Sequence, residues 1–409
     1  MTRFLRFLLS FLLIWAGSQP AGQLAAAAPF AQAPGFYLPP EYAATRAVLV
    51  SEIILADENG YRLIQALLQA RTEVWFLSDS VAGYEDMLGH LHQVYGLRAP
   101  DLARIRQLPV KTQSLWARDW APLMTLPSQP QTAQQTLLRM LDTRYLPQRP
   151  LDDSVPAQIG RFLQAQSPSR WRFQAVAVPL ALEGGNIMCT QSDCVLSDEV
   201  LIQNPPAYPG QSGGPDRISS VLAQQLDQRV SIVPRLPLES TGHLDMWAKF
   251  LDEKTLVIAE VPEQALKLVP RSLRQAYAEI RDFLEAQASG YDRGGQTLPN
   301  ALASQLRQRI PGLKIKRVPM PVPYADGHAA VFRSYTNSLL VNGHAILPRY
   351  VRDGYGRPYP DQRLLKDYEA SVQQVYEQAG FRVSWIDADY LILSGGAWHC
   401  ATMQVPGES

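Results

Sequence analysis

The chain has 409 residues, of which 46% are hydrophobic, so it can bury a large core and global disorder is excluded. Its 38 basic and 38 acidic residues cancel to a formal net charge of zero at pH 7. Without an excess of positive charge, we expect neither nucleic acid nor an anionic membrane surface as a partner.

The first 28 residues have the pattern of an export signal. Arg3 and Arg6 lie at the start of an apolar run, Phe7 to Trp15, and small residues follow at 25–28. A basic start, a short apolar segment and an alanine-rich cleavage region are typical of a signal peptide, and the run is too short to span a bilayer comfortably. The sequence therefore predicts that residues 1–28 are removed. The mature protein would be periplasmic or secreted, with no membrane contact.

Three cysteines are present, at 189, 194 and 400. Cys189 and Cys194 enclose a polar turn typical of a hairpin tip, where two cysteines can reach bridging distance. So short a loop gains only roughly 2 kcal/mol from closure. In an oxidising compartment this pairing leaves Cys400 as the odd, reactive thiol. A metal cluster of the cysteines with a histidine lacks the usual ligand spacing, so we expect no metal.

Residues 35–406 contain no obvious linker rich in proline or glycine, and we interpret them as one domain. Within it a unit recurs: a helix leads into a strand, and a segment of unusual polar residues follows the strand. The five candidate strands are Ile105–Val110, Phe173–Leu180, Val230–Pro237, Ile315–Pro323 and Phe381–Asp387. Five such units around one axis would bring five polar segments together. An ordinary α/β sheet, with the polar segments at its strand ends, is the alternative.

Local sequence patterns predict two helices, a hairpin turn and a further strand. Asp361 can cap a helix that Gly380 ends, because the intervening apolar residues fall on one face. A longer helix is expected over roughly Pro262–Ala288. The pair Asn342-Gly343 predicts a hairpin turn, and the apolar run Tyr390–Leu393 predicts a short buried strand. The apolar face of the first helix comprises Leu365, Tyr368, Val372, Val375, Tyr376 and Ala379.

Four polar stretches carry the candidate chemistry. Gly395-Gly396 can turn the backbone sharply just before Cys400, so that the thiol faces a pocket. A buried structural cysteine is the alternative interpretation of Cys400 taken alone. The other three stretches supply a histidine and several carboxylates suited to a cation, which favours a nucleophilic site. They are Trp116-Ala-Arg-Asp119, Glu183-Gly-Gly-Asn186 and His243-Leu-Asp245.

Taken together and in this order, the four stretches resemble those of the guanidine-modifying family, in the branch of bacterial peptidyl-arginine deiminases and agmatine deiminases. The resemblance runs from about Phe36 to Pro406. It implies an α/β fold, a five-bladed α/β propeller (pentein) with pseudo-five-fold ββαβ repeats. It also implies hydrolysis of a guanidinium group through a cysteine adduct and no cofactor.

Guanidinium hydrolysis requires a nucleophile and a proton carrier. Cys400 is the candidate nucleophile, because a thiolate divides the reaction into two steps. His243 is the candidate acid and base: it would protonate the departing ammonia and then activate water. It has an acid two residues on, so on a strand His243 and Asp245 would share a face. His328 is the rival that we keep, whereas His399 is set aside because strand neighbours point to opposite faces. A hydrogen-bonded core histidine is the remaining alternative for His243.

A planar cation with five N–H donors needs carboxylates as partners. The resemblance assigns Asp119 and Asp245 to guanidinium binding, and Trp116 to packing on the substrate. Glu183 would orient His243 or support its loop. Arg118 is expected to be a structural ion-pair partner, because a free cation would repel the substrate.

The substrate is either peptidyl-arginine or agmatine. Asn337 resembles a substrate-contacting residue of the peptidyl-arginine branch, and Arg149 resembles one of its two carboxylate-binding arginines. The second arginine position is Pro147 here, which weakens that assignment. The export signal favours the peptidyl-arginine branch, and agmatine deiminase is the alternative. An amidinotransferase and a non-catalytic guanidine-binding protein remain open.

Overall fold

Short apolar segments bounded by turns form the strands, and amphipathic segments between them form the helices. The structure, a computed structural model, describes residues 35–129, 136–165, 171–206, 214–267, 269, 271–321, 324–325, 330–352, 358 and 362–407. Pro34–Ser409 form one compact unit, to which all of the elements below belong. The described strands form six small sheets of two to four strands, so the fold is mixed α/β.

Four sheets share one topology: an antiparallel strand pair is followed by helical structure and by a third strand parallel to the second. The strands of these four units are β5 (Leu123–Pro127), β6 (Thr136–Arg144) and β7 (Trp171–Ala181); β8 (Ile187–Cys189), β9 (Asp193–Ser197) and β10 (Arg229–Val233); β11 (Ala248–Asp252), β12 (Thr255–Glu260) and β13 (Lys314–Pro319); and β16 (Leu339–Val341), β17 (His344–Arg349) and β18 (Arg382–Asp387). β1 (Phe36–Tyr37) extends the first of these sheets beside β5.

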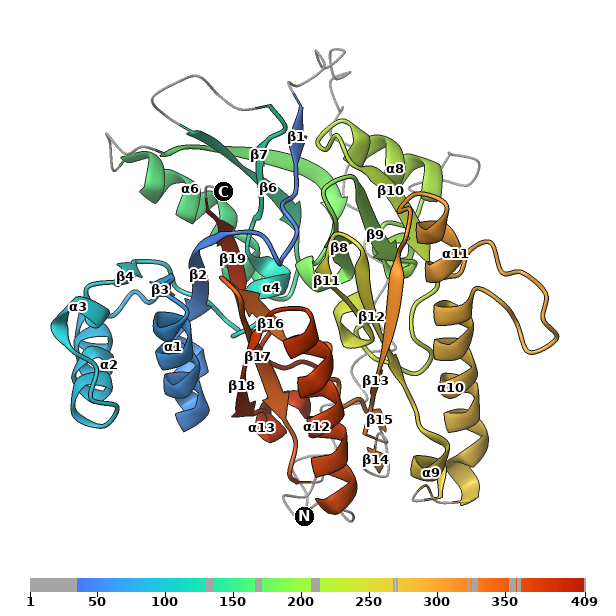
Figure 1. Cartoon of the computed structure of the whole chain (residues 1–409). Coiled ribbons are helices and arrows are strands. Elements are labelled where there is room, and N and C mark those ends of the chain that lie inside the picture. Colours follow the sequence, from blue (N-terminus) through green and yellow to red (C-terminus); the bar gives the residue numbers. More distant parts are fainter. Residues whose placement is uncertain are drawn as a thin grey trace. The chain divides into compact units, whose positions relative to one another are not determined.

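The fifth unit joins the two ends of the described chain. β19 (Met403–Pro406) pairs antiparallel with β2 (Thr45–Ser51), and β3 (Glu73–Leu77) pairs parallel with β2 after a helix. Figure 1 shows the red β19 beside the blue β2. β4 (Ile105–Leu108) is added parallel to β3 at the edge of this sheet, and β14 (Tyr324–Ala325) with β15 (Ala330–Val331) forms a separate pair.

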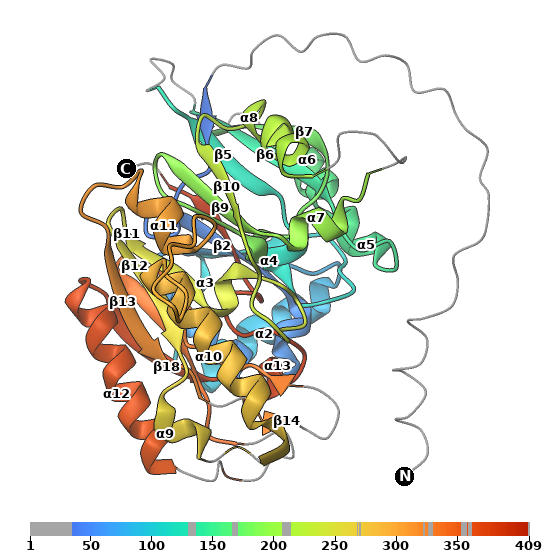
Figure 2. The same cartoon turned by 90° about the vertical axis from the view of Figure 1, so that its right-hand side faces the viewer.

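The helices pack on these sheets. α10 lies against β12, and α12 lies against β13 and β18 (Figures 1 and 2). The helices are α1 (Glu58–Gln69), α2 (Val81–Gln93), α3 (Ala99–Leu102), α4 (Ala117–Trp120), α5 (Pro150–Asp153), α6 (Val155–Ala165), α7 (Glu199–Gln203), α8 (Pro215–Ala223), α9 (Glu263–Leu266), α10 (Arg274–Ser289), α11 (Leu302–Arg307), α12 (Gln362–Gln378) and α13 (Asp389–Ile392). Short 3₁₀ turns are η1 (Glu52–Ala56), η2 (Gly184–Asn186), η3 (Leu244–Met246) and η4 (Arg271–Leu273). No helix among the described residues is long and apolar enough to cross a bilayer.

The five predicted strands are present as β4, β7, β10, β13 and β18, and each lies at an edge of its sheet. Their bounds differ from the prediction. β10 ends at Val233 rather than Pro237, since Pro234 has no N–H to donate to a ladder. β13 ends at Pro319, and residues 322–323 lie outside the described residues. β4 belongs to the five-strand set by position in sequence only, because β3 is the third strand of its ββαβ unit.

Two local predictions are confirmed. α12 buries Leu365, Tyr368, Val372 and Tyr376 on one face, and Gly380 after it has a left-handed φ of 92°. The Asn342-Gly343 pair joins β16 to β17 with positive φ at both residues, as a type I′ turn requires. The proposed cap Asp361 lies outside the described residues.

Two other predictions are wrong. Tyr390–Leu393 is not a strand: α13 covers Asp389–Ile392, because the backbone turns at Asp389, whose N–H donates to Asp387. A run of four apolar residues carries no periodicity that separates strand from helix. The single helix expected over Pro262–Ala288 is divided into α9, η4 and α10, and Gly290 ends α10 in a left-handed conformation.

Candidate active site

The candidate site is built from five short segments, and each directly precedes the first strand of one ββαβ unit. They are α4 before β5, η2 before β8, η3 before β11, residues 334–338 before β16, and residues 395–402 before β19. Each is a loop or a single helical turn, so its side chains are not constrained to the alternation of a strand. The recurring topology therefore gathers residues that lie almost 300 positions apart in sequence.

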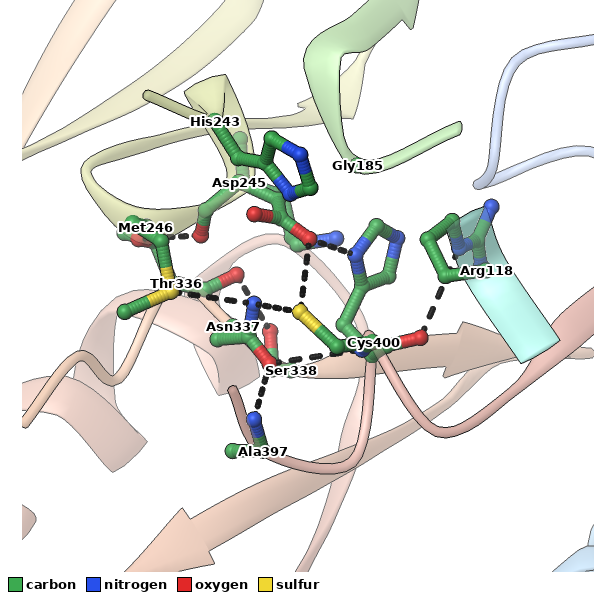
Figure 3. Close-up of polar contacts among 12 residues, drawn as sticks. Arg118, Gly185, His243, Asp245, Met246, Thr336, Asn337, Ser338, Ala397 and Cys400 are labelled. Atoms are coloured by element: carbon green, nitrogen blue, oxygen red, sulfur yellow. Dashed lines mark hydrogen bonds and ion pairs between the residues drawn. The ribbon is translucent and has the colours of Figure 1, made fainter. Parts of the chain in front are cut away.

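Cys400 lies at the centre of this group. It is 2% exposed, and its Sγ lies 3.0 Å from Asn337 Nδ2 and 3.4 Å from Asp245 Oδ2. Figure 3 shows these three side chains pointing toward one another. Asn337 Oδ1 accepts from the backbone N–H of Ala397 at 2.8 Å, which ties the side chain to the turn that carries Cys400. Asn337 thus both fixes this turn and donates to the sulfur.

The two glycines before Cys400 are needed for different reasons, Gly395 for its backbone conformation and Gly396 because a side chain would have no room. Gly395 has a φ of +99°, a conformation that favours glycine. A Cβ on Gly396 would lie 2.8 Å from Cys400 Sγ and 2.9 Å from Trp116 Cζ3. The half-buried Trp116 side chain therefore borders Cys400 across this glycine.

His243 lies beside the thiol. Its Nε2 is hydrogen-bonded to Glu183 Oε2 at 2.7 Å, and its Nδ1 lies 3.7 Å from Asp119 Oδ1. Ligand atoms of His243, Asp245 and Cys400 all lie within 4.8 Å of one another. The expected strand geometry is wrong, because His243 precedes the 3₁₀ turn η3, in which Asp245 lies. This turn nevertheless brings both side chains to Cys400.

Gly185 lets η2 approach these groups. A Cβ at this position would lie 2.5 Å from His243 Nδ1, 3.0 Å from Asp119 Oδ1 and 3.1 Å from Asp245 Oδ2. Its backbone N–H donates to Asp119 Oδ1 at 3.2 Å. The glycine pair of the sequence motif thus marks the point where the backbone borders two carboxylates and the imidazole.

Burial and the neighbouring charges both shift the pKa values of His243 and Cys400. Burial alone would lower the pKa of His243, but the charge of Asp119, the neighbouring Cys400 and the hydrogen bond and charge of Glu183 raise its pKa well above 6.5. Burial raises the pKa of the Cys400 thiol, and the Asp245 and Asp119 charges raise it further while His243 opposes them. Without a ligand the site therefore holds a charged imidazole beside a neutral thiol.

The three carboxyl groups differ in their ionisation. Burial, followed by the charges of Glu183 and Asp245, raises the pKa of Asp119 despite the nearby His243. Burial would also raise the pKa of Asp245, but the hydrogen bond from His399 and the charges of His399 and His243 keep it below the ordinary value. The pKa of Glu183 is lowered too, because the hydrogen bond and charge of His243 outweigh burial.

Beside Cys400, His243 Nδ1 and Asp245 Oδ1 are buried and have no hydrogen-bond partner among the described residues. Leaving such atoms unpaired in a protein interior costs about 1–3 kcal/mol each, so they indicate that a polar ligand completes the site. A carboxylate oxygen can accept from a donor-rich cation such as a guanidinium. Among the described residues, His243, Asp245 and Cys400 also form the one group whose spacing could hold a metal ion.

The remaining predicted residues lie around this centre. The charge of Arg149 helps to lower the pKa of Glu183, and its Nη1 donates to Tyr145 Oη at 3.1 Å. Arg118 Nη1 forms an ion pair with Glu41 Oε1 at 3.3 Å, as expected of a structural partner. The rival histidine, His328, lies outside the described residues.

The cysteine prediction is confirmed. Cys189 and Cys194 form a disulfide at the turn between β8 and β9, and Cys400 is the free cysteine. The odd thiol that the sequence indicates is therefore the thiol at the centre of the site.

Sequence reasoning missed Glu41, Lys249 and His399. His399 Nδ1 contacts Asp245 Oδ2 at 2.5 Å, its Nε2 contacts Glu41 Oε1, and Glu41 also pairs with Lys249 Nζ. His399 was set aside by an alternation argument that holds only in a strand, whereas residues 398–401 form a turn. One signal was available: Lys249 is the one charged residue in the run Met246–Leu251, and a lysine that is 3% exposed needs a buried partner.

Comparisons with known proteins agree with this fold. A Streptococcus mutans protein named for agmatine deiminase is 25% identical over 234 residues, which is 55% of this chain and 56% of that protein. The match therefore spans about half the length of that relative. A Porphyromonas gingivalis structure named for arginine deiminase superposes with a TM-score of 0.63 at 18% identity, over 91% of this chain and 98% of that one.

Another solved structure is the agmatine deiminase of Enterococcus faecalis, with a TM-score of 0.59 at 15% identity, over 94% of this chain and 99% of that one. At such identities the solved structures show a shared fold. The sequence profile described as Porphyromonas-type peptidyl-arginine deiminase matches residues 38–406, nearly all of the chain. The chain therefore belongs to the Porphyromonas-type peptidyl-arginine deiminase family.

Proposed function

We propose that this protein hydrolyses the guanidinium group of an arginine in a peptide, giving citrulline and ammonia. One observation carries the proposal: Cys400 Sγ, a His243 ring nitrogen and an Asp245 oxygen lie within 4.8 Å of one another, and His243 Nδ1 and Asp245 Oδ1 are buried without partners. A nucleophile, a proton carrier and a free carboxylate oxygen are what guanidinium hydrolysis requires. Membership of the family supports the same activity.

Substrate charge activates the nucleophile in this proposal. Asp245 and Asp119 raise the pKa of Cys400 in the free protein. A guanidinium bound to Asp119 and Asp245 would cancel these charges, so the thiol would release its proton to solvent as the substrate enters. Trp116, across Gly396 from the sulfur, would pack on the alkyl arm or on the guanidinium plane.

The reaction then proceeds in two steps. The Cys400 thiolate bonds to the guanidinium carbon, the C–N bond breaks, and the charged His243 gives its proton to the leaving ammonia. The neutral His243 next takes a proton from water, whose oxygen bonds to the same carbon as the C–S bond breaks. Glu183, at 2.7 Å from Nε2, would hold the ring and stabilise its charged form.

Agmatine is the second candidate substrate. The Streptococcus mutans relative is named for agmatine deiminase, and Pro147 stands where the peptidyl-arginine branch places a second carboxylate-binding arginine. Asn337 and Arg149 are proposed to contact the substrate. Agmatine lacks the carboxylate, so Arg149→Ala would weaken turnover of arginine-ending peptides much more than turnover of agmatine.

The activity test is direct. The protein without residues 1–28 is incubated with agmatine, arginine and a peptide ending in arginine, and ammonia is measured against Cys400→Ser. Ammonia from the peptide above the variant's rate supports the first proposal, and ammonia from agmatine alone supports the second. Release of ammonia from none of them, with amidino transfer to an added amine, would instead identify an amidinotransferase. Binding without any turnover would identify a guanidine-binding protein.

Two finer points belong to the same proposal. We propose that the five ββαβ units surround one axis as the blades of a propeller, because the topology of the units repeats. A crystal structure in which no common rotation relates the five sheets would contradict this arrangement. We also propose export, on the signal pattern of residues 1–28; cell fractionation and N-terminal sequencing of the mature protein test it.

A further inference from the structure

A buried chain of charged groups lies behind Asp245, on residues that the proposed reaction does not use. Glu41 contacts His399 Nε2, and His399 Nδ1 contacts Asp245 Oδ2 at 2.5 Å. His399 and Asp245 are 2% and 5% exposed. Lys249 Nζ and Arg118 Nη1 also pair with Glu41, so the far end of the chain is held by two cations.

The two oxygens of Asp245 have different surroundings. Oδ2 faces His399 Nδ1 and lies 3.4 Å from Cys400 Sγ, whereas Oδ1 is buried and has no partner in the part of the chain that the structure describes. We infer that His399 is a positioning residue, which holds Asp245 by Oδ2 so that its carboxylate stays fixed beside Cys400, where the guanidinium of the substrate would bind. Glu41 in turn fixes the His399 ring. This inference rests on the proposed guanidine-binding role of Asp245.

The geometry requires a particular state of His399. Both of its ring nitrogens face carboxylate oxygens, so both must donate and the ring carries a positive charge. The ring is then a buried cation between the buried carboxylate of Asp245 and the half-buried carboxylate of Glu41. This arrangement keeps Asp245 ionised and restrains rotation of its carboxylate. His399 contacts neither Sγ nor the free oxygen, so its effect on the substrate passes through Asp245.

Binding provides the first test, in the Cys400→Ser background to prevent turnover. Loss of a charge-assisted hydrogen bond at the orienting position should raise the Kd for the guanidine substrate by about tenfold to a hundredfold in His399→Gln. His344→Gln is the matched control, because His344 is a half-buried histidine on β17, outside the site. It should leave the Kd unchanged. An unchanged Kd in folded His399→Gln, judged by circular dichroism, would overturn the inference.

Rescue separates positioning from a general structural role. A cavity of about 70 Å³ is lined by Glu41, Asp245, Lys249 and His399, so a small molecule has space beside this chain. In His399→Gly, added imidazole should restore substrate turnover in proportion to its occupancy, since it can bridge Glu41 and Asp245. Imidazole should restore nothing in Asp245→Asn, which lacks the charged acceptor. Turnover lost in His399→Gly and not restored, in a protein with unchanged melting temperature, would contradict the inference.

The pH profile gives a readout that a folding defect would not move. The groups facing Asp245 are His399, His243, Lys249 and Cys400, with Asp119 across Gly185. Burial raises the pKa of Asp245 and His399 lowers it, so this pKa should rise when His399 is removed. The acidic limb of kcat/KM should then move to higher pH. An unmoved limb would count against the inference. If the unmodified protein turns over no guanidine, the proposed function fails; if it is active and the His399 variants match it, only this inference fails.

Discussion

The thiol of Cys400 is buried among groups that favour its neutral form. Asp245 lies 3.4 Å from Sγ and burial raises the pKa of the thiol, whereas Asn337 Nδ2, at 3.0 Å, can stabilise the thiolate once it forms. A nucleophile that ionises only when a cation arrives is protected from oxidation between turnovers, since the thiolate is the reactive form.

Replacing Cys400 by Ser should therefore eliminate catalysis but preserve binding. We expect ammonia release to fall by at least about 10³-fold, as for other nucleophile deletions, because a serine hydroxyl is a poor nucleophile beside carboxylates. The substrate should still bind, because Asp119, Asp245 and Trp116 are retained. Ammonia assays and calorimetric titration measure the two effects. His243→Gln serves as a comparison and should accumulate the covalent adduct, visible by mass spectrometry. Appreciable turnover by Cys400→Ser would refute the thiolate route.

Glu41 gives a prediction for stability against pH. Burial would raise its pKa, but His399, Lys249 and Arg118 keep the pKa well below the ordinary 4.5. A lowered folded-state pKa adds stability above the unfolded value, and this stability is lost as pH falls through the folded value. Glu41→Gln leaves buried cations unpaired, so it should cost about 3 kcal/mol or more near neutral pH. The cost should shrink well below pH 4.5, where wild type also becomes protonated.

Thermal melts of wild type and Glu41→Gln across this pH range measure the difference. The control is Glu58→Gln, because the Glu58 side chain is 52% exposed in its pair with His90. Exposed pairs contribute roughly 0–1 kcal/mol, so the control should change little at any pH. An equal loss from Glu41→Gln at every pH would show that its charge is not the stabilising feature.

At the scale of elements, the short segments before the first strand of each ββαβ unit determine the geometry of the site. η2 brings its backbone between α4 and η3: a Cβ on Gly184 would lie 2.2 Å from Arg118 O, and one on Gly185 would lie 2.5 Å from His243 Nδ1. The strands place these segments near one another, but η2 can approach α4 and His243 this closely only because Gly184 and Gly185 have no side chains.

Gly185→Ala should accordingly inactivate the protein while leaving it folded. The new methyl group would displace the His243 ring or the neighbouring carboxylates, and we expect kcat/KM to fall by about 10²-fold or more. Gly89→Ala is the control, since Gly89 lies in α2 with nothing within 4 Å of an added Cβ. Alanine there should stabilise the helix by about 0.5–1 kcal/mol and leave activity unchanged. A fully active Gly185→Ala would show that the approach seen here is not needed for catalysis.

At the scale of the whole compact unit, the last described strand pairs with one of the first. β19 pairs with β2, and Gln404 Nε2 donates to the Glu41 and Leu340 carbonyl oxygens at 2.9 and 2.6 Å. Cys400 lies three residues before β19, so this pairing also places the nucleophile. Correct folding of the site therefore requires both ends of the domain.

Weakening this pairing should lower stability as a whole. Val405 is fully buried in β19, and Val405→Ala should reduce the free energy of unfolding by about 1–3 kcal/mol, because it leaves a cavity. Leu393→Ala is the control, since Leu393 is 43% exposed. Denaturant titrations followed by tryptophan fluorescence should show one transition, shifted in Val405→Ala alone. A separate early transition that spares the rest of the protein would show that the ends are not coupled to the core.

The sequence by itself determined the features that depend on neighbours in the chain. The Asn342-Gly343 turn, α12 with its Gly380 stop, the Cys189–Cys194 pair and the glycines beside Cys400 each follow from local patterns of a few residues. The quoted motifs, through family resemblance, also indicated Cys400, His243, Asp119 and Asp245, which the structure brings together. Where a segment had no distinctive period, as in Tyr390–Leu393, local reasoning failed.

Only the tertiary structure decided which charges share the interior. Glu41 and His399 are 358 positions apart, and His399 and Asp245 are 154 apart, yet they form one buried chain. Sequence cannot show this, because the free energy of a buried charge is set by the groups packed around it, whatever their positions in the chain. For the same reason, the free oxygen of Asp245 became visible only when its other oxygen was seen to be occupied.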